Sequence, residues 1–209
     1  KFFEDYGAVI GDEAHLFKAV SLTKIMTKLT DCKYRIGLTG TLDDSKTHKL
    51  VLQGLFGTVN RVVSTKQLID KKQLAQLKVM CLNLKYPESE AKKVYGVKYF
   101  EELEYLTQNT ARNKYIRNLA LALKGNTLLL FQLVEKHGEI LFNLIKEKAD
   151  PKRKVFFVYG GTETDDREKI RAITEKSDNA IIVASFGTFS TGINIRNLHN
   201  IVFSSPTKS

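Results

Sequence analysis

Cysteine, histidine and long apolar runs are all scarce in this 209-residue sequence. Its two cysteines, Cys32 and Cys81, are too few and too isolated for a disulfide framework or a zinc site, so we expect reduced thiols in an intracellular protein. The four histidines show no metal-ligand spacing. No stretch approaches the roughly 18 apolar residues of a membrane span, and no signal-peptide pattern opens the chain. We therefore expect no membrane partner and a cytoplasmic location.

Positive charge, in contrast, is in excess. The chain has 33 lysines and arginines against 23 acidic residues, a net charge of +10. Such an excess favours a polyanionic partner, most simply nucleic acid. The alternative is a generally basic protein without such a partner, because the charges are scattered along the chain and do not form a tail.

Short apolar runs alternate with amphipathic stretches almost throughout, which is typical of a parallel α/β architecture. Helical spacing of apolar residues predicts helices over 21–29, 116–123 and 135–148, one ending at Leu55-Phe56-Gly57, and one capped by Ser64 or Thr65. The predicted strands are 8–10, 34–38, 61–63, 127–131, 155–158, 180–184 and 200–203.

The composition changes between about residues 85 and 125, where Glu, Lys and Tyr dominate and then helical spacing begins. This indicates a helical entry into a second domain, and we place the two domains at 1–80 and 81–209. The chain opens with Lys1 close to one predicted core strand and stops at Ser209 just after another. We therefore expect a fragment of a larger protein.

Two adjacent acids, Asp12 and Glu13, directly follow the apolar run 8–10. In open α/β sheets ligands bind at the carboxyl ends of the strands. Nucleotide hydrolases place one carboxylate there for Mg²⁺ and another for the attacking water. A second polar strand end, residues 37–41, follows the predicted strand residues Tyr34-Arg35-Ile36, so the sequence predicts one composite site. The alternative is that the acids only cap the following helix.

A glycine- and hydroxyl-rich segment, Ser185 to Gly192, follows the strand predicted at 180–184. Gly187 and Gly192 have the spacing of a phosphate-binding loop, but Ile193 and Asn194 stand where a Walker A loop has Lys and Ser or Thr. The segment is therefore not a Walker A loop. Its backbone N–H groups could still approach a phosphate, and the alternative is a turn without a ligand.

Taken together, these strand ends resemble the DEAH-type helicases of superfamily 2 along essentially the whole chain. Asp12-Glu13-Ala14-His15 matches motif II, Thr39-Gly40-Thr41 matches motif III, 127–132 falls at motif IV, and 185–195 resembles motif V. The resemblance implies two RecA-like parallel α/β domains, the first incomplete. ATP would bind in the cleft between them, and a nucleic-acid strand would cross their tops.

The resemblance also assigns roles to residues of the first domain. Asp12 would bind Mg²⁺ through its water shell, and Glu13 would orient or deprotonate the attacking water. His15 would couple the nucleotide site to motif III. Motif III itself would relay closure between the domains through Thr39, Gly40 and Thr41.

In the second domain the implied contacts are to the nucleotide and to the nucleic-acid backbone. Gly192 and Asn194 would approach the nucleotide, although many relatives carry Asp at the Asn194 position. The strand's phosphates would be contacted by Ser185, Gly187 and Thr188, and a further backbone contact would come from Gly161 and Arg167.

These roles imply an ATP-dependent DNA helicase or translocase motor that acts on branched recombination or repair intermediates. Its partners would be single-stranded or branched DNA, RNA as an alternative, and recombination proteins, in the cytoplasm or in a host cytoplasm if a phage encodes it. Another superfamily 2 motor, such as a restriction-system translocase or an RNA helicase, and a non-hydrolysing nucleic-acid-binding module are the alternatives.

The resemblance places several functional parts outside this sequence. The Walker A lysine and the adenine-binding glutamine motif are expected upstream of Lys1, and the arginine-rich motif VI beyond Ser209. Without them phosphoryl transfer falls by orders of magnitude. We therefore expect the fragment alone to be nearly inactive as an ATPase.

Overall fold

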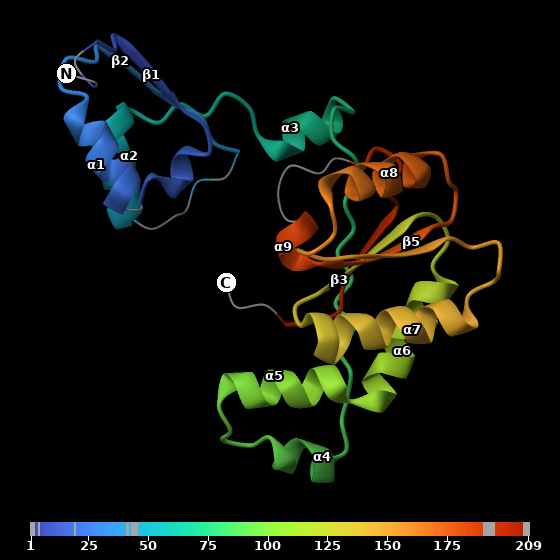
Figure 1. Cartoon of the computed structure of the whole chain (residues 1–209). Helices are drawn as coiled ribbons and strands as arrows, with labels where there is room; N and C mark the ends of the chain where they lie inside the picture. Colours follow the sequence, from blue (N-terminus) through green and yellow to red (C-terminus); the bar gives the residue numbers. More distant parts are fainter. Residues whose placement is uncertain are drawn as a thin grey trace. The chain divides into compact units, whose positions relative to one another are not determined.

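The computed structural model describes residues 3, 5–18, 20–40, 42, 46–189 and 195–206. The chain divides into two compact units, Lys1–Leu82 and Asn83–Ser209 (Figure 1). No helix in the described residues is both long enough and apolar enough to cross a membrane.

The first unit contains two parallel strands, β1 (Ala8–Gly11) and β2 (Tyr34–Gly37), with Ala8 opposite Tyr34 and Gly11 opposite Gly37. After β1 come η1 (Ala14–Lys18) and α1 (Val20–Lys28), and after β2 come α2 (Lys46–Phe56) and α3 (Thr65–Asp70). The two strands and the helices predicted at 21–29 and before Gly57 are thus confirmed to within one or two residues where they are described.

The core of the first unit lies on one face of these strands. Partly buried Val9 of β1 packs against helix and loop residues on that face, while Ile10 and its register partner Ile36 lie exposed on the other. This alternation follows from the opposite directions of successive side chains in a strand. The buried residues of the cluster are Met26, Leu29, Cys32 and Leu55.

Helix α3 begins where the sequence predicted. The Ser64 hydroxyl accepts the N–H of Gln67 at 3.2 Å, and the Gln67 side chain accepts the N–H of Ser64 at 2.8 Å, which forms a reciprocal capping box. The strand predicted at 61–63 is wrong. These residues form no strand in the described part of the chain, and the side chain of Val62 is 94% exposed, because no neighbouring strand or core covers it.

The second unit is built on four strands in the order β4-β5-β3-β6, and every pairing among them is parallel. Their bounds are β3 (Thr127–Phe131), β4 (Val155–Val158), β5 (Ile181–Ser185) and β6 (Asn200–Phe203). The strands predicted at 127–131, 155–158 and 200–203 are confirmed with the same bounds, and the strand predicted at 180–184 begins and ends one residue later. The parallel α/β fold class is confirmed.

Helices cover both faces of this sheet (Figure 1). On one face, α6 (Thr110–Ala122) and α7 (Glu139–Lys148) pack against Leu129, Phe131, Ile181 and Val183. On the other, Ile170 of α8 (Thr164–Glu175) packs against the cluster that contains Leu128, Leu130, Ile182 and Ala184. Because both faces are covered, β3 is buried at every residue, as expected for a central parallel strand.

The helix predicted at 135–148 is divided in the structure. A π-helical turn, η2 (Val134–Gly138), precedes α7. Gly138 lies directly against the Phe131 ring, and a Cβ atom there would lie 2.5 Å from the ring carbons. Only glycine permits this approach. Before α6, the helices α4 (Glu88–Lys93) and α5 (Tyr99–Gln108) form the helical entry to the unit.

A buried polar cluster joins η2 and α6 to the segment after β6. The Nδ1 atom of fully buried His137 lies 2.9 Å from the Ser205 hydroxyl, and Arg112 donates to the Ser204 carbonyl at 2.7 Å. Burial, and secondly the positive charge of Arg112, lower the pKa of His137 from 6.5 to about 4. The imidazole is therefore neutral in the folded chain at neutral pH.

This pKa predicts a loss of stability in mild acid. Between about pH 6.5 and about pH 4 the unfolded chain binds a proton at His137 that the folded chain does not bind. The free energy of unfolding should therefore fall by ~3 kcal/mol as the pH falls through this window. Urea denaturation at pH 7 and at about pH 4.5, followed by the amide signals of β3, measures it. His137→Gln should remove most of this pH dependence; an unchanged dependence in the variant would contradict the assignment.

Candidate nucleotide and nucleic-acid site

The two acids of the first unit lie exposed in a turn directly after β1. One carboxylate oxygen of Asp12 accepts the N–H of Glu13 at 2.8 Å. Glu13 has a φ of 49°, in the left-handed region that a residue with a Cβ adopts at a cost of about 1 kcal/mol. Such strain persists only when surrounding contacts impose it, and it concentrates at functional sites. The turn is therefore a candidate functional site.

Packing beneath the turn accounts for this imposed conformation. A Cβ atom on Gly11 would lie 3.0 Å from the rings of Phe17 and Phe56, and one on Gly37 would lie 3.0 Å from Phe56. The two rings themselves meet edge to face at 5.1 Å. The backbone N–H of Ala14 donates to the Leu38 carbonyl at 2.8 Å. The ends of both strands are thus joined directly to each other.

His15 connects the turn that contains Asp12 and Glu13, called the acid turn below, to the residues after β2. Its Nδ1 atom lies 2.9 Å from the Thr39 hydroxyl and 3.2 Å from a carboxylate oxygen of Glu13. Because an ionised carboxylate only accepts hydrogen bonds, we assign the proton to Nδ1 in this arrangement. The structure therefore brings Glu13, His15 and Thr39 together, with Asp12 adjacent in the chain and Gly40 next to Thr39. Thr41 lies outside the described residues.

The acid turn suits a magnesium ion held mainly by water and phosphate. In the described residues, no group of three or more His, Cys, Asp or Glu side chains is arranged to hold a metal ion. Mg²⁺ commonly takes only one or two protein carboxylates and completes its shell with waters and substrate phosphates. The exposed carboxylates of Asp12 and Glu13 fit that donor set.

In the second unit, the predicted backbone-contact residues share one edge of the sheet. Strands β4 and β5 are neighbours with Val158 opposite Ala184, so the segments that follow them leave the sheet side by side. The first of these segments is 159–162, which contains Gly161. The second begins at Ser185. This is the carboxyl edge, where parallel sheets bind ligands.

Arg167 holds the shape of the 159–162 loop. Its guanidinium donates to the Thr162 carbonyl at 2.8 Å and to the Gly160 carbonyl at 3.0 Å. Within the loop, a Cβ atom on Gly161 would lie 2.7 Å from the Tyr159 ring. Arg167 thus supports the loop, and two of its guanidinium nitrogens donate hydrogen bonds within it.

The segment after β5 begins with a short helix, α9 (Phe186–Phe189), where the sequence predicted a loop. The hydroxyls of Ser185 and Thr188 lie 2.6 Å apart, and Thr188 is buried, so this pair closes the turn. Gly187 is exposed, and a Cβ atom added to it would meet no described atom within 4 Å, which leaves its backbone open to a ligand. Gly192 and Asn194 lie outside the described residues.

One residue of this edge was missed by the sequence reasoning. Tyr159 is 38% exposed, stands at the end of β4, and packs its ring against Phe157 at 5.6 Å between centroids. Its backbone N–H donates to the Thr162 hydroxyl at 3.1 Å. The signal was an aromatic residue followed by two glycines and a threonine directly after a predicted strand.

Known proteins resemble this chain in sequence and in fold. No family model matches the chain. Over its whole length the chain is 35% identical to the ATP-dependent DNA helicase UvsW of Enterobacteria phage T4. The chain resembles a UvsW-like superfamily 2 helicase throughout. The crystal structure of T4 UvsW matches the whole chain with a TM-score of 0.57 at 34% identity.

The match covers only part of the relative. The chain spans 41% of the length of the UvsW sequence and 40% of the crystallised UvsW chain. A second solved structure, S. cerevisiae Dbp5 L327V bound to RNA and ADP BeF3, matches 97% of this chain and 45% of its own, with a TM-score of 0.50 at 15% identity. At that identity the likeness concerns the fold alone. Together the matches confirm the RecA-like α/β fold.

The contact between His15 and Thr39 can be tested in the 209-residue chain. Thr39→Val removes the hydroxyl with little change of shape, so the His15 ring loses one of two partners of Nδ1. We expect the ring proton and nitrogen chemical shifts of His15 to change in an NMR spectrum. Thr39→Ser keeps a hydroxyl and should leave them close to the wild type. Unchanged His15 shifts in Thr39→Val would show that the contact is absent in solution.

Proposed function

We propose that this chain is part of the motor core of an ATP-dependent DNA helicase or translocase. One observation carries the proposal: His15 contacts both Glu13 and Thr39 across the ends of two parallel strands. The contact joins the two segments that the resemblance assigns to motifs II and III. The 35% identity to a DNA helicase over the whole chain supports the same interpretation.

In this proposal the acid turn is the hydrolytic site. Asp12 holds Mg²⁺ through water, and Mg²⁺ when bound neutralises charge on the phosphates of ATP. The Glu13 carboxylate orients the attacking water or takes its proton. Its position is fixed by the strained backbone and by His15. His15 then links the state of this site to Thr39, and through it to Gly40 and Thr41.

The carboxyl edge of the second unit is the proposed track for the nucleic-acid backbone. Gly161 and Gly187 offer backbone N–H groups and half-buried Ser185 offers a hydroxyl, which suit phosphate oxygens. The buried Thr188 hydroxyl bonds to Ser185 and so supports this turn from within. Arg167 supports the first of these loops. Gly192 and Asn194 are proposed to approach the nucleotide. Binding of this kind is tolerant of sequence and sensitive to salt.

We further propose that residues 1–80 and 81–209 are parts of two RecA-like domains, and that the substrate is single-stranded or branched DNA. Action on recombination and repair intermediates rests on the resemblance alone, with RNA as the alternative substrate. No Gly-x-x-x-x-Gly-Lys-Ser/Thr segment occurs in the 209 residues, so hydrolysis is expected of the complete protein and not of this chain alone.

The catalytic assignment is tested by Glu13→Gln in the complete protein. Loss of the carboxylate should lower DNA-stimulated ATP hydrolysis at least about 100-fold, because the amide cannot accept the proton of water. DNA binding should be retained. Asp31→Asn, which makes the same change of charge in the loop before β2, should leave hydrolysis near the wild-type rate. Full DNA-stimulated activity in Glu13→Gln would refute the assignment.

The nucleic-acid track is tested by Arg167→Ala in the complete protein. Loss of the loop support should weaken binding of single-stranded oligonucleotides about fivefold at low salt, roughly equally for different sequences. Arg171→Ala is the matched control, because Arg171 lies on the same helix but pairs with Glu168 and Glu175. Wild-type affinity should fall steeply as salt rises. A flat salt dependence, or a loss confined to one sequence, would contradict the phosphate track.

A further inference from the structure

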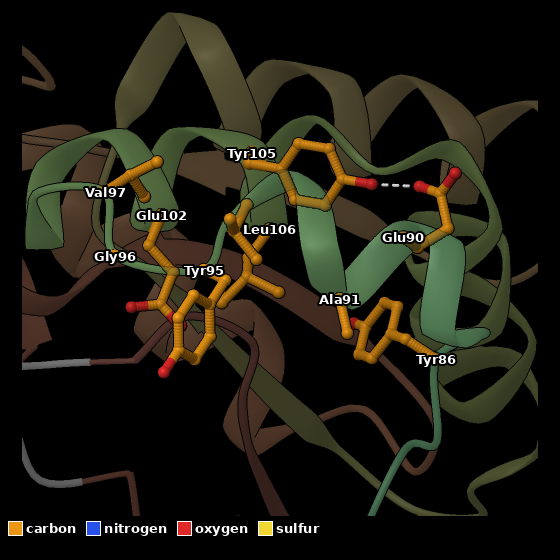
Figure 2. A pocket seen from close by; sticks show the side chains of 10 residues that line it. Tyr86, Glu90, Ala91, Tyr95, Gly96, Val97, Glu102, Tyr105 and Leu106 are labelled. Carbon is orange, nitrogen blue, oxygen red and sulfur yellow. Dashed lines mark hydrogen bonds between the residues drawn. The ribbon is translucent and has the colours of Figure 1, made fainter.

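A cavity of about 500 Å³ lies between α4, the turn after it and α5 (Figure 2). Three tyrosines line it: Tyr86, Tyr95 and Tyr105. Its polar walls come from Glu90 and Glu102, and the remaining walls are mostly apolar. We call this cavity the tyrosine pocket. Its volume is within the range of small-ligand sites.

Tyr95 is the most exposed of the three tyrosines. Its side chain is 91% exposed, and it is followed by Gly96 with a φ of 77°, which ends the turn after α4. Figure 2 shows Tyr95 with Glu102 at one end of the pocket and Tyr86 at the other. A tyrosine ring with so much of its surface uncovered offers its π face to a ligand that can stack there.

The Tyr105 side of the pocket is fixed by hydrogen bonds. The Tyr105 hydroxyl donates to Glu90, as the dashed line in Figure 2 marks, and Lys93 pairs with the same carboxyl group at 2.6 Å. The bonds from Lys93 and then from Tyr105 lower the pKa of Glu90. Glu90 is therefore ionised, and Lys93 compensates its charge.

The charge that remains in the pocket belongs to Glu102. Of the five glutamates in α4 and α5, four have partners: Glu88 with Lys92, Glu90 with Lys93, Glu101 with the Lys98 N–H, and Glu104 with Lys136. In the described part of the chain, no partner is found for the Glu102 carboxylate. Residues 83–108 contain five glutamates and four lysines, a net charge of −1 in a chain of net charge +10.

This local charge decides which kind of ligand the pocket suits. A phosphate strand would bring further negative charge against an unpaired carboxylate, and like charges repel. A cation would pair with Glu102 and stack on the exposed face of Tyr95. A planar guanidinium does both at once, and its methylene stem can lie along the apolar walls.

We propose that the tyrosine pocket binds an arginine side chain carried by a peptide segment of a partner protein. The guanidinium stacks on Tyr95 and donates to the Glu102 carboxylate. The Glu90–Tyr105 pair holds the opposite wall. The proposal does not depend on nucleotide hydrolysis or on nucleic-acid binding at the sheet edge, so it is tested independently of the proposed function.

The test is an NMR titration of the 209-residue chain with a short capped peptide of glycine and serine around one arginine. We expect saturable shifts of the amide signals of Gly96 and Val97. The same peptide with citrulline, which is neutral, should produce none. Tyr95→Ala and Glu102→Gln should each weaken binding about tenfold, the size of a cation–π contact or a charged hydrogen bond.

Two matched variants separate binding from folding. Tyr95→Phe keeps the ring and should bind as the wild type does. Glu88→Gln makes the same change of charge on α4 outside the pocket and should also bind normally. The proposal is overturned if a folded chain shows no saturable response, if citrulline works as well as arginine, or if a single-stranded oligonucleotide shifts the same amides and the peptide does not.

Discussion

One buried amide, the side chain of Asn126, holds together the amino ends of the strands in the second unit. Its Nδ2 atom approaches the carbonyls of Thr174, Ser177 and Asn197 at 2.9, 2.6 and 2.7 Å, and its Oδ1 atom accepts the N–H of Ala180 at 2.7 Å. Leaving any one of these buried polar groups without a hydrogen-bond partner costs about 1–3 kcal/mol. The amide therefore fixes where β3, β5 and β6 begin. These strands run parallel, so their carboxyl ends, including the start of the proposed phosphate-contact segment after β5, lie at the opposite edge of the sheet.

In the first unit, glycines and aromatic rings determine where the two strands end. Gly11 and Gly37 end the two strands where Phe17 and Phe56 leave no space for a side chain. The chain must turn at that level, and the turn presents Asp12 and Glu13 to solvent. The left-handed φ of Glu13 is a cost of this arrangement, and its contact with His15 is the geometry on which the proposed function rests. Packing below the turn thus determines where the carboxylates of Asp12 and Glu13 lie.

Charge separates the proposed surfaces of this protein. The chain is basic as a whole, which suits a nucleic-acid backbone. The helical entry formed by α4 and α5 has a slight negative charge, with Glu102 unpaired in the described part of the chain. If the chain binds a polyanion as proposed, a cationic partner is recognised most readily where the local charge is negative. A tyrosine-lined pocket with such a carboxylate meets that condition for a cationic side chain.

The sequence by itself predicted the strands at 8–10, 34–38 and 127–131, a helix capped by Ser64 or Thr65, and the motifs that resemble superfamily 2 helicases, because apolar periodicity and capping are local properties. The tertiary structure decided the rest. Residues 61–63 have the composition of a strand but no neighbour to pair with in the described chain, and the helix predicted from Glu135 gives way to a π turn where Gly138 meets the Phe131 ring. The hydrogen bond between His15 and Thr39 depends on the register of β1 and β2. Contacts between residues distant in the chain are set by packing and pairing, which no local pattern encodes.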